Sequence, residues 1–134
     1  MKLTKTEREF VESMRVVRVA TVNKDGVPHN VPVCPFVKND KVYFATERKA
    51  RKLRNIKANP NLALAFDEYT DAWDHLRGVS IQGTARIVSK SEFRRLRKEI
   101  YAKYTQYESK AAIGERDSVI VEVTPDKKFS WGLK

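Results

Sequence analysis

The chain has 134 residues, a hydrophobic fraction of 41% and a formal net charge of +10. This length fits one domain spanning residues 1–134, the apolar content excludes wholesale disorder, and no apolar run approaches the roughly 20 residues of a membrane-spanning helix. The positive charge favours anionic partners in general, whether nucleic acid, a phosphorylated cofactor or a polycarboxylate.

The first predicted elements are a helix and a β-hairpin. Thr4 and Glu7 have the spacing of a capping box, which predicts a helix over Thr4–Met14. The β-branched segment Val16–Val22, the turn NKDG and the segment Val27–Val37 predict two paired strands. Because the second strand contains three prolines, we expect it at an edge, a bulge or a barrel rim.

The chain continues with a strand, a basic helix and another strand. Val42–Thr46 reads as the third strand of a meander. Between Arg48 and Lys57 stand six basic residues and no acid, and this run predicts a helix that ends before Pro60. The apolar segment Asn61–Phe66 then predicts a short strand.

The second half of the chain also contains both predicted strands and predicted helices. Its predicted elements are a polar loop or short helix (Asp67–Gly78), a strand (Val79–Val88), a basic helix (Phe93–Tyr104), a loop (Thr105–Asp117) and two strands (Ser118–Val123 and Lys127–Leu133). Ser91 is a suitable N-cap for the basic helix. Six or seven strands with two or three helices, mostly in meander order, predict a mainly β, α+β fold built on a small antiparallel barrel.

The first basic helix allows two interpretations. Its apolar face centres on Leu53, and Arg51 and Asn55 lie opposite, so a solvated amphipathic helix explains the pattern. Alternatively, Thr46 ends the preceding strand and could cap the helix, whose free N–H groups and nearby basic side chains would bind a phosphate. The chain has no glycine-rich phosphate loop, which speaks against an ordinary ATPase or Rossmann protein.

Nucleic-acid binding is a weaker alternative. Two basic helices and the net charge could form a binding surface. However, the sequence contains no helix-turn-helix pattern and no aromatic signature of an RNA-recognition strand. We therefore expect the protein to bind a small anionic ligand rather than nucleic acid.

Residues that commonly perform catalysis are few. Cys34 lies in the proline-rich strand, and we interpret it as a buried, inert thiol. His29 and His75 lack the partners of a catalytic triad, and the acids of the Asp67–Asp74 segment lack the spacing of a calcium loop. We therefore predict no metal site and name no catalytic side chain. One cysteine and a charged N-terminus without a signal-peptide core indicate a cytoplasmic protein.

Three segments together resemble the pyridoxamine 5′-phosphate oxidase-like, FMN-binding split-barrel superfamily. They are ATVNKDGVPHNVPV (Ala20–Val33), VYFATERKARKLRNIKANPNLALAF (Val42–Phe66) and VSIQGTARIVS (Val79–Ser89), with a weaker similarity in FSWG (Phe129–Gly132). The loop YTDAWDHLRGV (Tyr69–Val79) resembles a subgroup of deazaflavin (coenzyme F-420)-dependent enzymes. The order and spacing of the segments make the resemblance fairly specific.

The resemblance implies a split-barrel homodimer that holds FMN, or alternatively the deazaflavin F-420, at the subunit interface. Thr46, Arg51 and Lys52 would hold the cofactor phosphate, the strand backbone at Val31–Val33 would lie beside the ring, and Trp131 would lie near the cofactor. The full set of implied cofactor-binding residues is Val31, Pro32, Val33, Ala45, Thr46, Arg51, Lys52 and Trp131.

The sequence also departs from true pyridoxamine-phosphate oxidases. Their second strand carries an Arg and a Lys, where this chain has Val31 and Phe36, and Gly78 replaces a Gln. Only three residues follow Trp131, and the arginines found there in those enzymes are missing. These departures speak against pyridoxamine phosphate as substrate, and a deazaflavin with a polyglutamate tail would suit the surplus of basic residues.

The function expected from the sequence is therefore a flavin- or deazaflavin-dependent oxidoreductase that acts on an unidentified small molecule. A non-catalytic carrier or sensor of the same cofactor is the main alternative. A nucleic-acid-binding protein is the weaker one.

Overall fold

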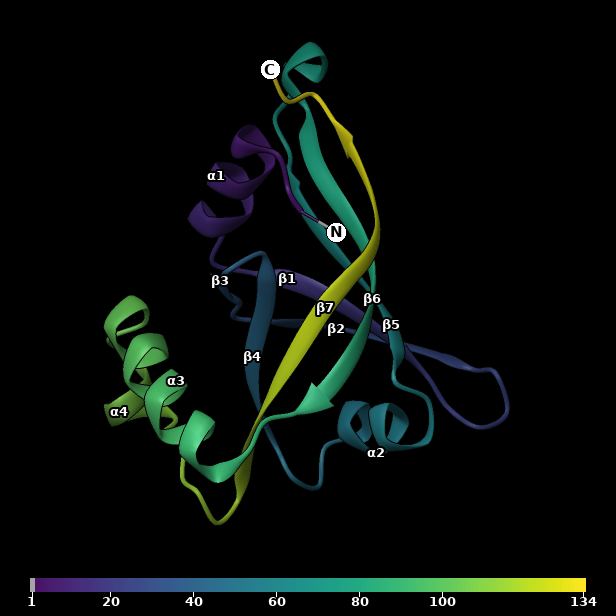
Figure 1. The fold of residues 1–134 in the computed structure, drawn as a ribbon. Coiled ribbons are helices and arrows are strands. Elements are labelled where there is room, and N and C mark those ends of the chain that lie inside the picture. Colours follow the sequence, from purple (N-terminus) through teal and green to yellow (C-terminus); the bar gives the residue numbers. More distant parts are fainter. Residues whose placement is uncertain (1) are drawn as a thin grey trace.

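A computed structural model describes residues 2–134 and contains one antiparallel sheet that curls into a half-open barrel (Figure 1). The strands are β1 (Val17–Val22), β2 (Pro28–Val33), β3 (Phe36–Lys38), β4 (Lys41–Glu47), β5 (Asn61–Glu68), β6 (Arg77–Ile87) and β7 (Ser118–Trp131). Their order across the sheet is β2-β1-β5-β6-β7-β4-β3. The mainly β, α+β split-barrel prediction is confirmed, with seven strands.

Four α-helices and one 3-10 turn accompany the sheet within the described residues. They are α1 (Lys5–Ser13), α2 (Arg51–Ala58), η1 (Trp73–His75), α3 (Lys90–Lys103) and α4 (Tyr107–Lys110). In Figure 1, α1 lies near the end of the barrel that holds the C-terminus, and α2 lies near the other end. Among the described residues, no helix is long and apolar enough to cross a membrane.

Side chains that alternate along the strands build the barrel core. In β5, Leu62, Leu64 and Phe66 are buried in the core, whereas Ala63 and Ala65 point to the opposite face and stay partly exposed. This period of two is the geometry of a strand with one buried face. A sequence with this alternation therefore curls its sheet around the larger apolar side chains.

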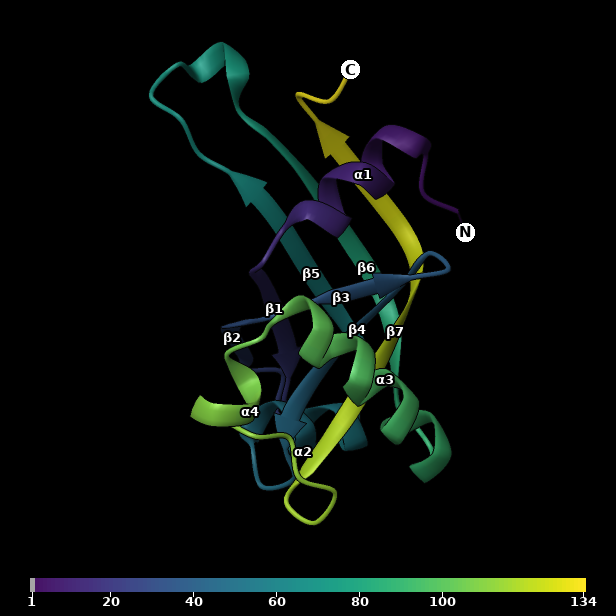
Figure 2. The ribbon, with the colours of Figure 1, turned by 90° about the vertical axis from the view of Figure 1, so that its left-hand side faces the viewer.

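The helix α3 forms a second apolar cluster on the outside of the sheet. Its residues Phe93, Leu96 and Ile100 pack with Tyr43 of β4 and Ile120 of β7. Figure 2 shows α3 in front of β4 and β7, with α4 to its left. The outer face of β1 and β5 carries the small side chains of Ala20, Ala63 and Ala65 together with the Arg18–Asp67 ion pair.

Several boundaries differ from the sequence predictions for local reasons. The second predicted strand is divided into β2 and β3 on either side of Cys34 and Pro35. Because β2 and β3 lie at opposite edges of the sheet, the predicted meander of the first three strands is wrong. Ser89, not Ser91, is the N-cap of α3, because its hydroxyl and Glu92 form the capping box. The predicted final two strands are one continuous β7.

The continuity of β7 depends on an irregularity in its pairing with β6. The register shifts between Gln82 and Gly83, which pair with Lys127 and Pro125, so Asp126 has no partner in the ladder. A proline lacks the N–H of a ladder hydrogen bond, and such residues are tolerated at bulges. Pro125 therefore bends the strand without ending it.

Candidate functional site

An open pocket of about 350 Å³ lies where the end of β4 approaches the start of α2. Its walls come from the end of β2, from β4, from the β4–α2 connection and from α4. The lining residues are Pro32, Val33, Cys34, Ala45, Thr46, Glu47, Ala50, Lys52 and Tyr107. The pocket thus joins segments that are far apart in the sequence.

Five of the eight residues implied by the family resemblance line this pocket: Pro32, Val33, Ala45, Thr46 and Lys52. Val31 precedes them in β2 but pairs with Val19 and does not line the pocket. Arg51 is exposed on the first turn of α2, beside the pocket. The remaining residue, Trp131, lies at the far end of β7 and does not line the pocket.

The start of α2 opens toward the pocket without a side-chain cap. The N-cap is Ala50, which has no side chain that can accept a hydrogen bond from the first turn. The prediction that Thr46 caps this helix is wrong, because β4 continues to Glu47, which pairs with Ser118 of β7. An uncapped N-terminus leaves N–H donors and a partial positive charge available to an anion.

Core contacts hold α2 in this position. Leu53 and Ile56 enter the barrel core, and the side-chain amide of Asn55 donates a 3.0 Å hydrogen bond to the hydroxyl of Thr21. Asn55 is 5% exposed, so its predicted place on the polar face is wrong. The reason is that a short helix across a barrel end is enclosed on more than one side.

Two opposite charges lie in the pocket. Burial lowers the pKa of the Lys52 amine, and the negative charge of Glu47 partly opposes this shift. A bound phosphate would favour the protonated amine and so raise that pKa again. Lys52 is therefore suited to gain charge stabilisation when an anion binds, whereas Glu47 limits how much negative charge the pocket accepts.

Trp131 lies at the opposite end of β7 from the pocket (Figure 1). From Ser118, which pairs with Glu47, to Trp131 the strand covers roughly 40 Å at about 3.3 Å per residue. The Trp131 ring stacks on the exposed Phe129, with 5.8 Å between the ring centroids. Within one chain, Trp131 therefore cannot contact a ligand in the pocket.

Cys34 and Tyr107 line the pocket, although neither was expected to do so. Cys34 is partly exposed, which contradicts its interpretation as a buried thiol. Burial, together with the neighbouring Cys34, raises the pKa of Tyr107 to about 12, so its hydroxyl is a neutral donor near pH 7. Tyr107 belongs to α4, which lies inside the segment predicted to be a loop. Its ring packs against the rings of Tyr101 and Tyr104, and these contacts hold it beside the pocket.

The pocket can therefore bind an anion at the start of α2 and can present a neutral hydroxyl and a thiol to the rest of a ligand. Within residues 2–134, no group of three or more His, Cys, Asp or Glu side chains is placed to hold a metal ion.

Comparisons with known proteins place this geometry in a family. Residues 3–132 match the family described as pyridoxamine 5′-phosphate oxidase. The conserved hypothetical protein Rv2991 from Mycobacterium tuberculosis is a similar solved structure, with 27% identity and a TM-score of 0.82 over 96% of this chain and 84% of that one. No curated protein matches the sequence.

Two further solved structures share the fold at lower identity. An F420 reductase has 22% identity and a TM-score of 0.76 over 95% of this chain and 98% of that one. HutZ, the heme storage protein from Vibrio cholerae, has 16% identity and a TM-score of 0.83 over 99% of this chain and 97% of that one. Because the family match covers nearly the whole sequence, the chain belongs to the pyridoxamine 5′-phosphate oxidase family.

Proposed function

We propose that the protein is an oxidoreductase that binds a flavin-type cofactor, either FMN or the deazaflavin F-420, and acts on a small molecule. The observation that carries this proposal is the uncapped start of α2, which faces the pocket. Lys52 and Thr46 line the same pocket. Membership of the family and similarity to an F420 reductase support the choice of cofactor class. A cytoplasmic location is part of the same proposal.

The residues of the pocket fit the phosphate end of such a cofactor. Lys52 and the first N–H groups of α2 would hold the phosphate, and Arg51 would add a second cation from the adjacent surface. The partly exposed backbone around Pro32 and Val33 would lie beside the ring. When bound, the cofactor would supply the redox chemistry, while the protein binds and orients it.

A second copy of the chain would complete the site. Trp131 is remote from the pocket of its own chain, and the outer face of β1 and β5 presents the small residues Ala20, Ala63 and Ala65. A pocket of about 350 Å³ is at the lower end of the roughly 300–1,000 Å³ of ligand sites. We therefore propose a homodimer in which Trp131 of one protomer approaches the pocket of its partner.

The double variant Arg51→Ala/Lys52→Ala tests the phosphate clamp. Loss of two charge-assisted contacts should weaken binding of FMN or F-420 by about 10- to 100-fold, given about 1.5–3 kcal/mol for such bonds and partial compensation by the helix N-terminus. Fluorescence titration at constant ionic strength measures the affinity. Circular dichroism should report an unchanged fold, because Arg51 is exposed and Lys52 is not part of the core.

A matched control removes the same charge from the same helix. Arg54 and Lys57 are exposed on α2 and do not line the pocket, so Arg54→Ala/Lys57→Ala should change the affinity less than about threefold. Equal losses in both double variants would mean that general charge, and not a clamp, attracts the cofactor. Binding without reduction by NAD(P)H or a reduced deazaflavin would instead identify a carrier or sensor.

A further inference from the structure

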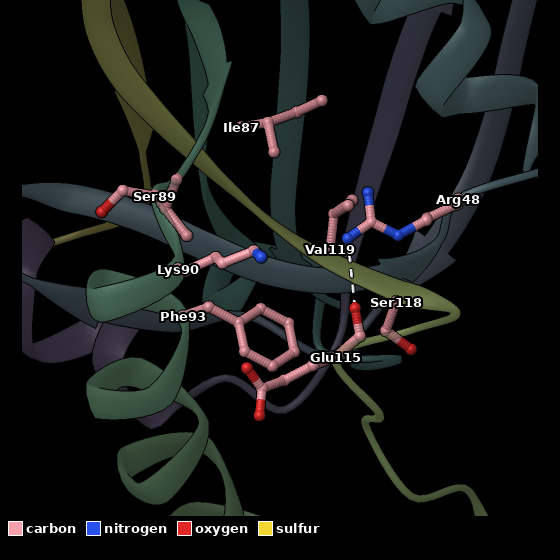
Figure 3. A pocket seen from close by; sticks show the side chains of 9 residues that line it. Arg48, Ile87, Ser89, Lys90, Phe93, Glu115, Ser118 and Val119 are labelled. Carbon is pink, nitrogen blue, oxygen red and sulfur yellow. Dashed lines mark hydrogen bonds between the residues drawn. The ribbon is translucent and has the colours of Figure 1, made fainter.

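A second pocket lies on the other side of the β4–α2 connection, between the start of α3 and the segment that leads into β7 (Figure 3). It measures about 120 Å³. Its lining residues are Arg48, Ile87, Val88, Ser89, Lys90, Phe93, Glu115, Ser118 and Val119. Glu47 lines the first pocket and Arg48 lines this one, so adjacent residues face two separate sites.

Two cations converge on this pocket from different elements. Nε of Arg48 donates to the carbonyl of Arg116 at 2.9 Å, and Nη2 donates to the carbonyl of Glu115 at 3.1 Å. These bonds fix the guanidinium plane but leave its Nη1 without a hydrogen-bond partner among residues 2–134. Lys90 extends from the first turn of α3 toward the same space, and its amine likewise has no partner in the described chain (Figure 3).

The one acidic side chain in the lining does not neutralise these cations. The carboxylate of Glu115 is 3.0 Å from Nε of Arg94 and 3.9 Å from Nη2 of Arg97. In Figure 3 it lies beyond the Phe93 ring from the amine of Lys90. Its charge is therefore already balanced on α3, and the pocket keeps a net positive charge.

The walls between the charges are apolar. Val88, Phe93 and Val119 are between 3% and 8% exposed. Apolar walls of this kind exclude water from one side of a bound anion and so strengthen its attraction to the cations, which are themselves exposed. The pocket of about 120 Å³ is large enough for a small oxyanion group.

The start of α3 is partly satisfied by its own residues. In the capping box, the hydroxyl of Ser89 accepts from the N–H of Glu92, and the carboxylate of Glu92 accepts from the N–H of Ser89. An anion in the pocket would therefore depend mainly on the side chains of Arg48 and Lys90. That dependence makes the site testable by substitution.

We propose that this pocket binds one small oxyanion group, a phosphate or a carboxylate, between Arg48 and Lys90. The site is separate from the proposed cofactor pocket and does not require a flavin. Arg48 supplies a fixed, planar donor, whereas Lys90 supplies a mobile point charge that can adjust to either oxyanion. Ser118 lines the same space and adds a hydroxyl that can donate to the bound group.

Titration of the full chain with inorganic phosphate, and separately with glutarate, tests this proposal by amide NMR at constant ionic strength. The amides of Ser89, Ser118 and Val119 should shift and saturate at millimolar concentration. Lys90→Gln should weaken the saturating response at least fivefold. Lys98→Gln, which removes the same charge from an exposed position of α3 outside the pocket, should leave it within about twofold.

The two ligands distinguish the source of the oxyanion. Saturation by phosphate alone identifies a phosphate site, saturation by glutarate alone a carboxylate site, and saturation by both a general oxyanion site. Shifts that do not saturate with either ligand, or equal effects of Lys90→Gln and Lys98→Gln, would overturn the proposal. The Lys90 variant carries the test, because loss of Arg48 would also release the carbonyls of Glu115 and Arg116.

Discussion

Gly78 leaves the space that the ring of Trp131 occupies. A Cβ built on Gly78 would collide with the Trp131 ring and would lie 2.6 Å from the carbonyl oxygen of Phe66. Only glycine leaves space for an indole at this distance from the strand. The Gln of true pyridoxamine-phosphate oxidases at this position is therefore incompatible with the observed place of Trp131.

Gly78→Ala should lower the free energy of unfolding by about 1–3 kcal/mol, as overpacking of a close contact usually does. Combining it with Trp131→Ala should recover part of this loss, because the ring is one of the two obstacles. Urea unfolding of the single and double variants measures the coupling. Gly114→Ala is the control, since a Cβ there meets nothing within 4 Å.

At the scale of an element, the cap of α3 illustrates how charge and local structure combine. Arg86 donates to the carboxylate of Glu92 at 2.7 and 3.1 Å, while the backbone N–H and hydroxyl of Ser89 donate to the same group. The Arg86 guanidinium, followed by Ser89, lowers the pKa of Glu92 from 4.5 to about 2. The carboxylate therefore stabilises the fold while it is ionised.

This shift has a defined dependence on pH. A lowered pKa contributes stability above about pH 4.5, and that contribution is lost as the pH falls through about 2. Glu92→Gln should cost about 0.5–1 kcal/mol at pH 7, since the side chain is 26% exposed, and the difference from wild type should be much smaller at pH 2. Urea unfolding at both pH values measures it. Glu9→Gln, at an exposed position of α1, should change stability equally little at both.

The connection from β4 to α2 marks a limit of sequence reasoning about elements. The basic run and Pro60 locate the helix, because charge periodicity and proline geometry are local properties. The length of β4 is not local: Glu47 pairs with Ser118, which is distant in the sequence. The strand therefore extends past Thr46, and the helix begins without the expected cap.

At the scale of the whole molecule, the number and pattern of the strands predicted an antiparallel barrel. The strand order was not predicted, because β1 pairs with β5 and β4 pairs with β7, which are distant in the sequence. Segments near each other along the chain, such as Ala45, Thr46 and Lys52, could be assigned to one pocket because β4 and α2 are adjacent. Tyr107 could not, because α4 reaches the pocket only through packing on α3. Tertiary contacts of this kind leave no periodic signal in a single sequence.

The exposed outer face of the sheet leads to a prediction about assembly. Ala63 and Ala65 of β5 and Ala20 of β1 lie on this face beside the Arg18–Asp67 ion pair, and small residues let two sheets approach closely. If this face joins two copies, Ala63→Arg should bury unpaired charges and convert the dimer into monomers. Ala112→Arg places the same side chain on an exposed loop and should leave the dimer intact.

Light scattering coupled to size exclusion measures the outcome. Wild type and Ala112→Arg should have about twice the 15.5 kDa mass of one chain, and Ala63→Arg should have that mass once. The net charge of +10 makes the two copies repel each other, so added salt should strengthen the dimer through screening. A dimer that survives Ala63→Arg, or a wild-type monomer at high salt, would show that this face does not join two copies. In either case Trp131 could not reach a partner's pocket by this route.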